Sequence, residues 1–176
     1  MAILEIITYP DPLLNEESEK VTDFGDATQT LIDDMAETMF EAPGAGLAAV
    51  QVGVSKKIIV VNTTPSPENE ADEPEPSWYP LVNPEIVETE GSFLSEDEGC
   101  LSVPELRGNV KRASLVKVKA QDREGNPITI NADGFEAVVL QHEIDHLNGI
   151  LFFEHLSALK RNLYKKKVKK LFNNKK

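Results

Sequence analysis

Apolar residues recur at helical spacing in three stretches of the chain. The first stretch predicts an amphipathic helix of about four turns that ends before Pro43, and its apolar positions are Ala27, Leu31, Ile32, Met35, Met39 and Phe40. The second predicts a helix over about 134–148, with Asp133 as its N-cap and Gly149 as its C-terminal stop. The third predicts a helix over about 157–172, in which a thin apolar stripe among lysines is formed by Leu159, Leu163, Val168 and Leu171.

Between these helices the pattern changes to that of β-strands. Residues 57–62 contain a β-branched run that is typical of a buried strand, and a second strand is expected over 81–89. Residues 115–120 alternate apolar and basic side chains, and the strand predicted over 127–131 follows after a turn, which indicates a β-hairpin. Because strands and helices do not alternate regularly, the pattern favours an α+β fold.

Residues 64–76 differ from everything around them. The segment contains four prolines and five acidic residues and almost no apolar side chain. Such a segment buries too little surface to offset the entropy of ordering it, so we expect an exposed loop. It lies between two predicted strands and is therefore an insertion within the fold.

Length and composition are those of an ordinary globular protein. The chain has 176 residues, of which 40% are hydrophobic, and this fits one domain with a single core. The N-terminus has neither a basic stretch nor a long apolar run, and no later run is long enough to cross a bilayer. We therefore expect a cytoplasmic protein with no membrane partner and, from its single cysteine, no internal disulfide.

The net charge of −12 is unevenly distributed. Residues 158–176 carry nine basic side chains and no acid, whereas the other 157 residues carry 9 bases and 30 acids, a net charge of −21. An acidic body with a basic tail suggests that the tail meets an anionic partner. A solvated helix surface explains the charges equally well.

The second predicted helix contains the candidate metal-binding and catalytic residues. His142 and His146 are four residues apart, so their imidazoles lie on one face of the helix and can reach one metal ion. Glu143 lies between them in the H-E-x-x-H motif, where it can move a proton without binding the metal. Phe135, Val138 and both histidines continue one apolar stripe, so the rings should point inward. Ordinary hydrogen-bonded core histidines are the alternative, and the intervening glutamate favours metal binding.

A catalytic tetrahedral site needs three protein ligands and one open position. In one protease pattern a third ligand follows at the position that Phe152 occupies, and a phenyl ring cannot bind a metal. Glu154 and His155 follow too closely beyond the helix. Cys100 is the best remaining candidate, because Gly99 and Pro104 predict a bent segment around it and a thiolate with two imidazoles suits Zn²⁺ or Fe²⁺.

Three segments of the chain resemble the signature motifs of the peptide deformylase family. They are G-A-G-L-A-A-V-Q at 44–51, E-G-C-L-S at 98–102 and Q-H-E-I-D-H-L at 141–147. Their order and spacing are also similar to the family pattern, as is Y-P-D-P-L-L at 9–14. The resemblance covers nearly the whole chain and differs from the commonest pattern at Ala45 and Val50, as well as in the longer acidic loop.

The resemblance implies one deformylase-like domain over 1–176, with mixed or antiparallel sheets around the metal-binding helix and with N- and C-terminal helices. It implies hydrolysis of the formyl group from N-formylmethionyl peptides, with Fe²⁺ as the metal in vivo and Zn²⁺, Ni²⁺ or Co²⁺ as possible replacements. It assigns the residues as follows: metal ligands Cys100, His142 and His146; acid/base Glu143; formyl-oxygen donors Gln51 and the N–H of Leu101; and substrate contacts Gly46, Arg107 and Val138.

Several alternatives remain open from the residues themselves. Gln51 also fits a surface or backbone-capping role, Arg107 a solvated charge, and Asp145 a hydrogen bond to a ligand histidine or a pair with Arg112. The resemblance suggests that the basic tail contacts the ribosome, and nothing points to DNA. The competing functions are a metal peptidase and a structural metal site in a ribosome-binding module.

Overall fold

The computed structural model describes residues 2–174, without the side chains of 172–174. Its α-helices are α1 (Asp26–Glu41), α2 (Gly134–Leu147) and α3 (Ala158–Asn174), and short 3-10 helices span Pro12–Asn15 (η1), Ala49–Val52 (η2) and Phe152–His155 (η3). The strands are β1 (Gly46–Ala48), β2 (Ile58–Asn62), β3 (Trp78–Glu90), β4 (Phe93–Cys100), β5 (Val103–Arg112), β6 (Leu115–Gln121) and β7 (Pro127–Asp133). The fold is α+β, as the sequence pattern predicted.

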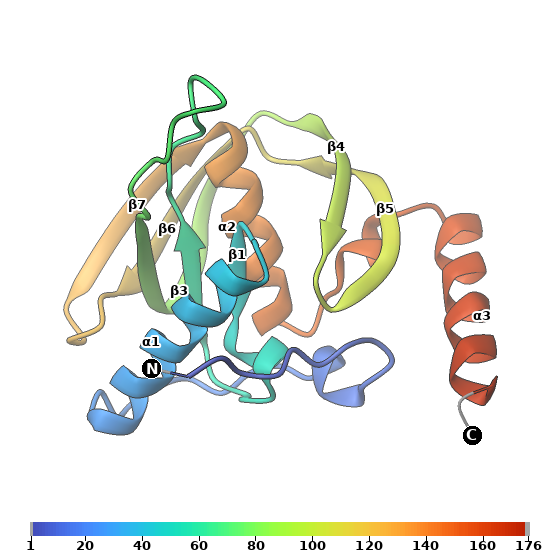
Figure 1. Ribbon diagram of the computed structural model, residues 1–176, viewed down its shortest axis with the longest axis horizontal. Coiled ribbons are helices and arrows are strands. Elements are labelled where there is room, and N and C mark those ends of the chain that lie inside the picture. The colour runs from blue at the N-terminus through green and yellow to red at the C-terminus, as the bar shows by residue number, and fades with distance from the viewer. Residues whose placement is uncertain (1, 175–176) are drawn as a thin grey trace.

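Two antiparallel sheets flank the second helix. The larger sheet has the strand order β1-β2-β3-β6-β7, and the smaller consists of β4 and β5. Figure 1 shows α2 between the larger sheet and the β4–β5 hairpin, with α3 standing outside that hairpin. Helix α2 contacts β1, β2, β3, β6 and β7. This central position explains why most of its side chains are buried.

Three groups of buried apolar side chains hold these layers together. One joins α2 to the larger sheet through residues such as Leu140 and Val118. A second packs α1 onto β2 through Met35 and Met39. The third surrounds Phe153 of η3 and joins the β4–β5 hairpin to the C-terminal segment. Burial of apolar surface stabilises the fold. Each segment that bears a predicted site residue is therefore anchored in a packed layer.

The predicted helices are present, and Asp133 occupies the N-cap of α2 as predicted, although its side chain makes no capping hydrogen bond. Gly149 follows the helix with a φ of +75°, and a Cβ there would lie 2.5 Å from the carbonyl oxygen of Asn15. Glycine is therefore required at this stop by both backbone conformation and space.

The strand predictions were incomplete. The strand predicted over 81–89 begins earlier, at Trp78, and neither β1 nor the β4–β5 hairpin was predicted as strands. Short and polar strands lack the apolar alternation on which the prediction rested. The loop over 64–76 is largely exposed, as expected.

The apolar stripe predicted for the C-terminal helix is confirmed only at Val168. Leu159, Leu163 and Leu171 of α3 are 71%, 58% and 48% exposed. The helix packs through Val168 and through Tyr164, which was not part of the predicted stripe. Lys175 and Lys176 of the basic tail lie outside the described residues. Across residues 2–174 no helix combines the length and apolar character needed to cross a membrane.

Candidate active site

Three potential metal ligands from two distant segments meet beside α2. The sulfur of Cys100, at the end of β4, and one ring nitrogen each of His142 and His146 lie within 4.8 Å of one another. The Cys100 sulfur is 3.3 Å from Nε2 of His146. The rings of the two histidines are 5.0 Å apart, as expected for residues one helical turn apart.

The donor atoms suit a single ion. Sulfur and imidazole bind zinc-like ions at about 2.0–2.3 Å, which places neighbouring ligand atoms within roughly 4 Å of one another. Burial lowers the pKa of His146 well below its usual value and keeps that ring neutral, the form that binds a metal. Burial would also lower the pKa of His142, but hydrogen bonds with Cys100 and Glu98 raise it to about 10. These surroundings favour a positive charge, which a divalent cation would supply in place of the ring proton.

A buried ionic network orients His142. Its Nδ1 lies 3.3 Å from Oε1 of Glu98, which leaves Nε2 facing the sulfur. Arg112 donates to both carboxylate oxygens of Glu98, at 2.7 and 3.0 Å, and to Asp145 at 3.0 Å. Burial would raise the pKa of Glu98, but the bonds from His142 and Arg112 lower it to about 2. The carboxylate therefore stays charged beneath the histidine.

The same network determines the role of Asp145. Its Oδ2 accepts from Arg112 and lies 2.9 Å from Nε2 of His155, so it pairs with the arginine and not with a ligand histidine. Phe152, which fails as a metal ligand, instead stacks on the ring of His142 with an interplanar angle of 26°. Glu154 accepts from the N–H of Leu151. The residues just beyond the helix thus support the site without joining the group of metal donors.

Glu143 points into the same space and is 5% exposed. Its Oε2 is buried and has no hydrogen-bond partner among the described residues. Burial raises its pKa to about 7, with nearby positive groups opposing the shift. A carboxyl group with that pKa can both accept and release a proton near neutral pH.

Gln51 is buried beside the sulfur. Its Nε2 donates to Oγ of Ser102 at 3.1 Å and lies 3.6 Å from Sγ of Cys100. Its Oε1 accepts from the N–H of Ala48, so the amide is held by the backbone while it lines the pocket. Gln51 is therefore not a surface residue. Its hydrogen bond with the backbone, as in the backbone-capping alternative, helps to position its side chain. Leu101 follows Cys100 and lines the same pocket.

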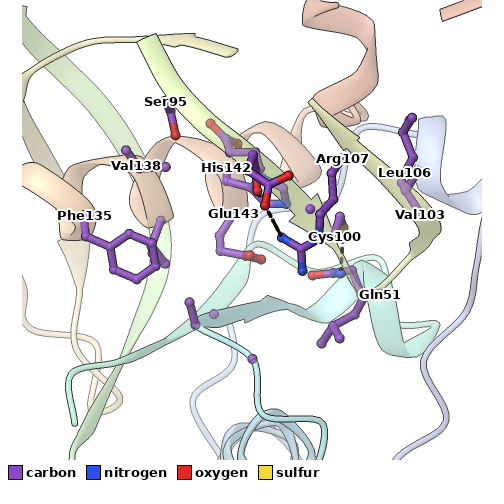
Figure 2. Close-up of a pocket in the computed structure, with 18 of the residues that line it drawn as sticks. Gln51, Ser95, Cys100, Val103, Leu106, Arg107, Phe135, Val138, His142 and Glu143 are labelled. Atoms are coloured by element: carbon purple, nitrogen blue, oxygen red, sulfur yellow. Dashed lines mark hydrogen bonds and ion pairs between the residues drawn. The ribbon is translucent and has the colours of Figure 1, made fainter. Parts of the chain in front are cut away.

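These groups line a cleft of about 680 Å³. Figure 2 shows Phe135 and Val138 on the α2 side of the pocket, and Val103 and Leu106 on the β5 side. Phe135 is 71% exposed, so it belongs to the cleft wall and not to the buried stripe predicted for it. Val138 is buried and lines the cleft, while the guanidinium of Arg107 is largely exposed at its edge.

Gly46 of β1 lines the cleft directly beside α2. A Cβ at this position would lie 2.9 Å from both Cγ of Glu143 and Cγ1 of Val139. Only glycine allows β1 to approach α2 this closely. The first motif therefore places the backbone, and not a side chain, next to the proposed acid/base.

Sequence reasoning missed the residues that support the ligands. Glu98 lies within the E-G-C-L-S motif, but nothing in that motif identifies its contact with His142. Arg112 was considered only as a partner of Asp145. A charged residue at an inward-facing strand position is a weak signal of a buried ion pair, and the sequence does not name the partner.

The fold and the site fit a hydrolase with one metal centre, because three side chains that could hold an ion and a buried carboxyl group lie beside an open cleft. Comparisons with known proteins agree. The sequence model of the polypeptide deformylase family matches residues 3–162. A peptide deformylase of Desulfotalea psychrophila is 55% identical over 172 residues, covering 98% of both chains.

Solved structures are similar as well. The crystal structure of a peptide deformylase from Legionella pneumophila has a TM-score of 0.83 and 42% identity, and the match covers 99% of this chain and 98% of that one. The peptide deformylase of Ehrlichia chaffeensis in complex with actinonin has a TM-score of 0.86 and 44% identity, over 97% and 98% of the two chains. The chain belongs to the peptide deformylase family. It is a metal-dependent hydrolase that removes the N-terminal formyl group from N-formylmethionyl nascent peptides.

Proposed function

We propose that Cys100, His142 and His146 hold the single metal ion of this deformylase and that Glu143 is its acid/base. The observation that carries this assignment is the convergence of one sulfur and two ring nitrogens within 4.8 Å, beside a buried carboxyl group without a partner. Cys100, His142 and Glu143 line the cleft. A structural metal site would be closed by a fourth protein ligand, and the described residues offer three.

The chemistry divides between the ion and the side chains. When bound, the metal ion acts as a Lewis acid that activates water and polarises the formyl carbonyl. Glu143 accepts the proton of the attacking water and then delivers it to the amine nitrogen as the C–N bond breaks. Nε2 of Gln51 and the N–H of Leu101 donate to the formyl oxygen as its negative charge grows. One such donor contributes on the order of 3–4 kcal/mol to the transition state.

The substrate peptide lies in the cleft between α2 and β4–β5. Val138 lines the pocket for the methionine side chain, and the backbone at Gly46, on β1 beside α2, contacts the peptide. Arg107 contacts the peptide at the rim, where its side chain is exposed. A single domain over 1–176 carries the whole site.

We propose Fe²⁺ as the metal in vivo because the chain resembles the deformylase family, with Zn²⁺, Ni²⁺ or Co²⁺ able to replace it. One thiolate and two imidazoles suit this group of divalent ions, and geometry does not separate them. Iron beside a thiolate predicts loss of activity in air, because the metal or Cys100 oxidises. Equal half-lives with and without oxygen would contradict iron as the working metal.

The decisive experiment measures formate released from a formyl-Met-Ala-Ser peptide by protein purified without oxygen, together with its metal content. We expect formate, no internal cleavage and about one metal ion per chain. Cys100→Ala should lose most of the metal after dialysis, whereas Ser114→Ala, in the turn after the β4–β5 hairpin, should keep it. Full metal retention in Cys100→Ala would remove Cys100 from the ligand set.

We also propose that the basic tail meets the ribosome in the cytoplasm, where nascent chains emerge. The lysines of α3 are exposed, and among the described residues Lys167 is the only one of them in an ion pair, with Glu105. Contacts between lysines and RNA phosphates weaken as salt rises. Co-sedimentation with ribosomes at low salt should decrease on deleting 158–176, and unchanged co-sedimentation would refute the contact.

A further inference from the structure

Gln141 is the one polar residue of the segment 141–147 that neither belongs to the metal donors, nor moves a proton, nor pairs with Arg112. It directly precedes His142 in α2. Its side chain is half-buried and does not line the cleft. The amide nevertheless makes three hydrogen bonds, in which Nε2 donates twice and Oε1 accepts once. Both donors of the amide are therefore used.

Two of these hydrogen bonds go to the backbone of a single residue, Ala113. The N–H of Ala113 donates to Oε1 of Gln141 at 2.8 Å, and its carbonyl oxygen accepts from Nε2 at 3.0 Å. Nε2 also donates to the carbonyl oxygen of Ala137, one turn earlier in α2, at 2.9 Å. The side chain is thus fixed to its own helix and pairs with Ala113 as a residue of an antiparallel strand would. We call this pairing the Gln141 clamp.

The clamp attaches the β4–β5 hairpin to α2. The hairpin carries Cys100, Glu98 and Arg112, and it forms a sheet of its own, apart from the larger sheet (Figure 1). In the described part of the chain, four pairs of residues form hydrogen bonds between α2 and residues 93–113. Three of them join side chains of the metal site and its charged network, namely Cys100 with His146, Glu98 with His142, and Arg112 with Asp145. The fourth is the clamp, and it alone holds the backbone.

The clamp also differs from the other three pairs in charge. Both of its partners are neutral, so it depends neither on the protonation of a ring nor on a bound cation. Ala113 directly follows Arg112, so the clamp fixes the end of β5 from which the guanidinium reaches Glu98 and Asp145. Glu98 in turn contacts His142. Metal affinity commonly depends on outer contacts of this kind, because they orient the ligands.

We propose that Gln141 is a positioning residue for the metal site, whose clamp on Ala113 holds Arg112 beneath Glu98 and keeps the hairpin in place against α2 before the metal binds. The inference rests on the proposed function, in which Cys100 of the hairpin and His142 of α2 share one ion. Ligands from two separate layers bind one ion tightly only when the layers are already held in the right geometry. Preorganisation reduces the free energy lost in ordering them on binding.

The test compares the Co²⁺ affinity of the wild-type protein with that of Gln141→Met, measured by competition with a chelator. Methionine has a similar length but makes no strong hydrogen bond. We expect a loss of about 3- to 10-fold, less than for removal of Arg112 itself, because Gln141 acts through that residue. With Co²⁺ saturating, KM for a formyl-Met-Ala-Ser peptide should stay unchanged, because Gln141 does not line the cleft.

Gln29→Met is the matched control. Gln29 is also half-buried, and its side chain also makes three hydrogen bonds, with Phe24 and Arg123, which do not line the cleft. Both variants should lower the midpoint of urea unfolding, whereas only Gln141→Met should lower Co²⁺ affinity. If the two variants bind Co²⁺ equally well, Gln141 is merely a stabilising contact and the proposal is wrong.

A double-mutant cycle tests the action through Arg112. If the clamp works by holding Arg112, adding Gln141→Met to Arg112→Met should cause no further loss of Co²⁺ affinity. Losses that add up would mean that Gln141 acts independently of the charged network, and they would overturn the proposed action on Arg112.

Hydrogen exchange in the wild-type protein tests the clamp without any variant. The N–H of Ala113 donates to Gln141, so it should be protected in the metal-free protein as well as in the Co²⁺-loaded protein. Rapid exchange of this amide in the metal-free protein would show that the clamp does not form before the metal binds, and it would overturn the proposal. Failure of the wild-type protein to bind Co²⁺ at all would instead contradict the proposed function.

Discussion

Helices α2 and α3 are similar in length but opposite in their relation to the rest of the protein. Nine of the 14 residues of α2 are buried, including His142, Glu143 and His146. In α3 only Tyr164 is buried among the described side chains, and its lysines are exposed. Both helices were predicted from apolar spacing, with capping residues as additional evidence for α2. The difference in burial between the two helices therefore depends on which neighbouring segments pack against each of them.

Polar residues show the contrast most clearly. The polar groups of α2 contact residues distant in sequence, such as Glu98 and Arg112, and burial shifts their pKa values. The lysines of α3 are exposed, Lys167 pairs only with the exposed Glu105, and Arg161 donates to the carbonyl oxygen of the nearby Glu154. A buried carboxyl or imidazole is costly unless it is paired or used, so its presence in α2 indicates function. An exposed lysine carries no such implication.

The largest effect should come from removing the acid/base on α2. Glu143→Gln keeps the volume of the side chain but cannot accept a proton, so kcat should fall by roughly 10²- to 10⁴-fold. Metal content, measured by atomic absorption, should stay the same. The control Glu136→Gln lies in the first turn of the same helix and should keep wild-type turnover. A fully active Glu143→Gln enzyme would contradict the catalytic role that distinguishes α2 from α3.

The next largest effect concerns the network beneath the ligands. Arg112→Met leaves Glu98 and Asp145 without their cation, so the orientation of His142 is lost and metal affinity should fall about 10- to 100-fold. Competition between the protein and a chelator for Co²⁺ measures this directly. Lys111→Met removes a neighbouring exposed charge and should change little. Unaltered Co²⁺ affinity in Arg112→Met would show that the network is only structural.

The pH dependence of activity tests the burial of Glu143. Its pKa is raised to about 7, and catalysis needs the deprotonated carboxylate. The rate should therefore be fully developed above this pKa and fall about tenfold for each pH unit below it. Profiles of kcat/KM between pH 5 and 9 would reveal this limb, at roughly the position given by that pKa. An inflection near the usual glutamate value would mean that water reaches Glu143 freely.

The smallest effects should occur on α3. Tyr164→Phe loses the hydrogen bond from the hydroxyl to the carbonyl oxygen of Pro104, 3.2 Å long, and should lower the free energy of unfolding by about 1 kcal/mol. The neighbouring Leu163→Ala alters an exposed side chain and should change it by less than about 0.5 kcal/mol. Urea unfolding of both variants provides the comparison. A larger loss in Leu163→Ala would mean that the exposed leucines are packed in solution.

Several features of this protein could be predicted from short stretches of the sequence, without knowledge of the fold. The four-residue spacing of His142 and His146 requires only the period of a helix, and Phe152 could be rejected as a ligand from its side chain alone. The acidic loop and the basic tail follow from composition in the same way. These features depend on residues close together in sequence, where geometry is set by the backbone.

Tertiary structure decided the contacts between distant segments. The sequence proposed Cys100 as the partner of the two histidines, but only the packing of β4 against α2 brings the three donor atoms together. The pairing of Arg112 with Glu98 and the exposed leucines of α3 were equally inaccessible. Each depends on strand register and burial, which arise from the whole chain packing at once and leave no periodic trace in any one segment.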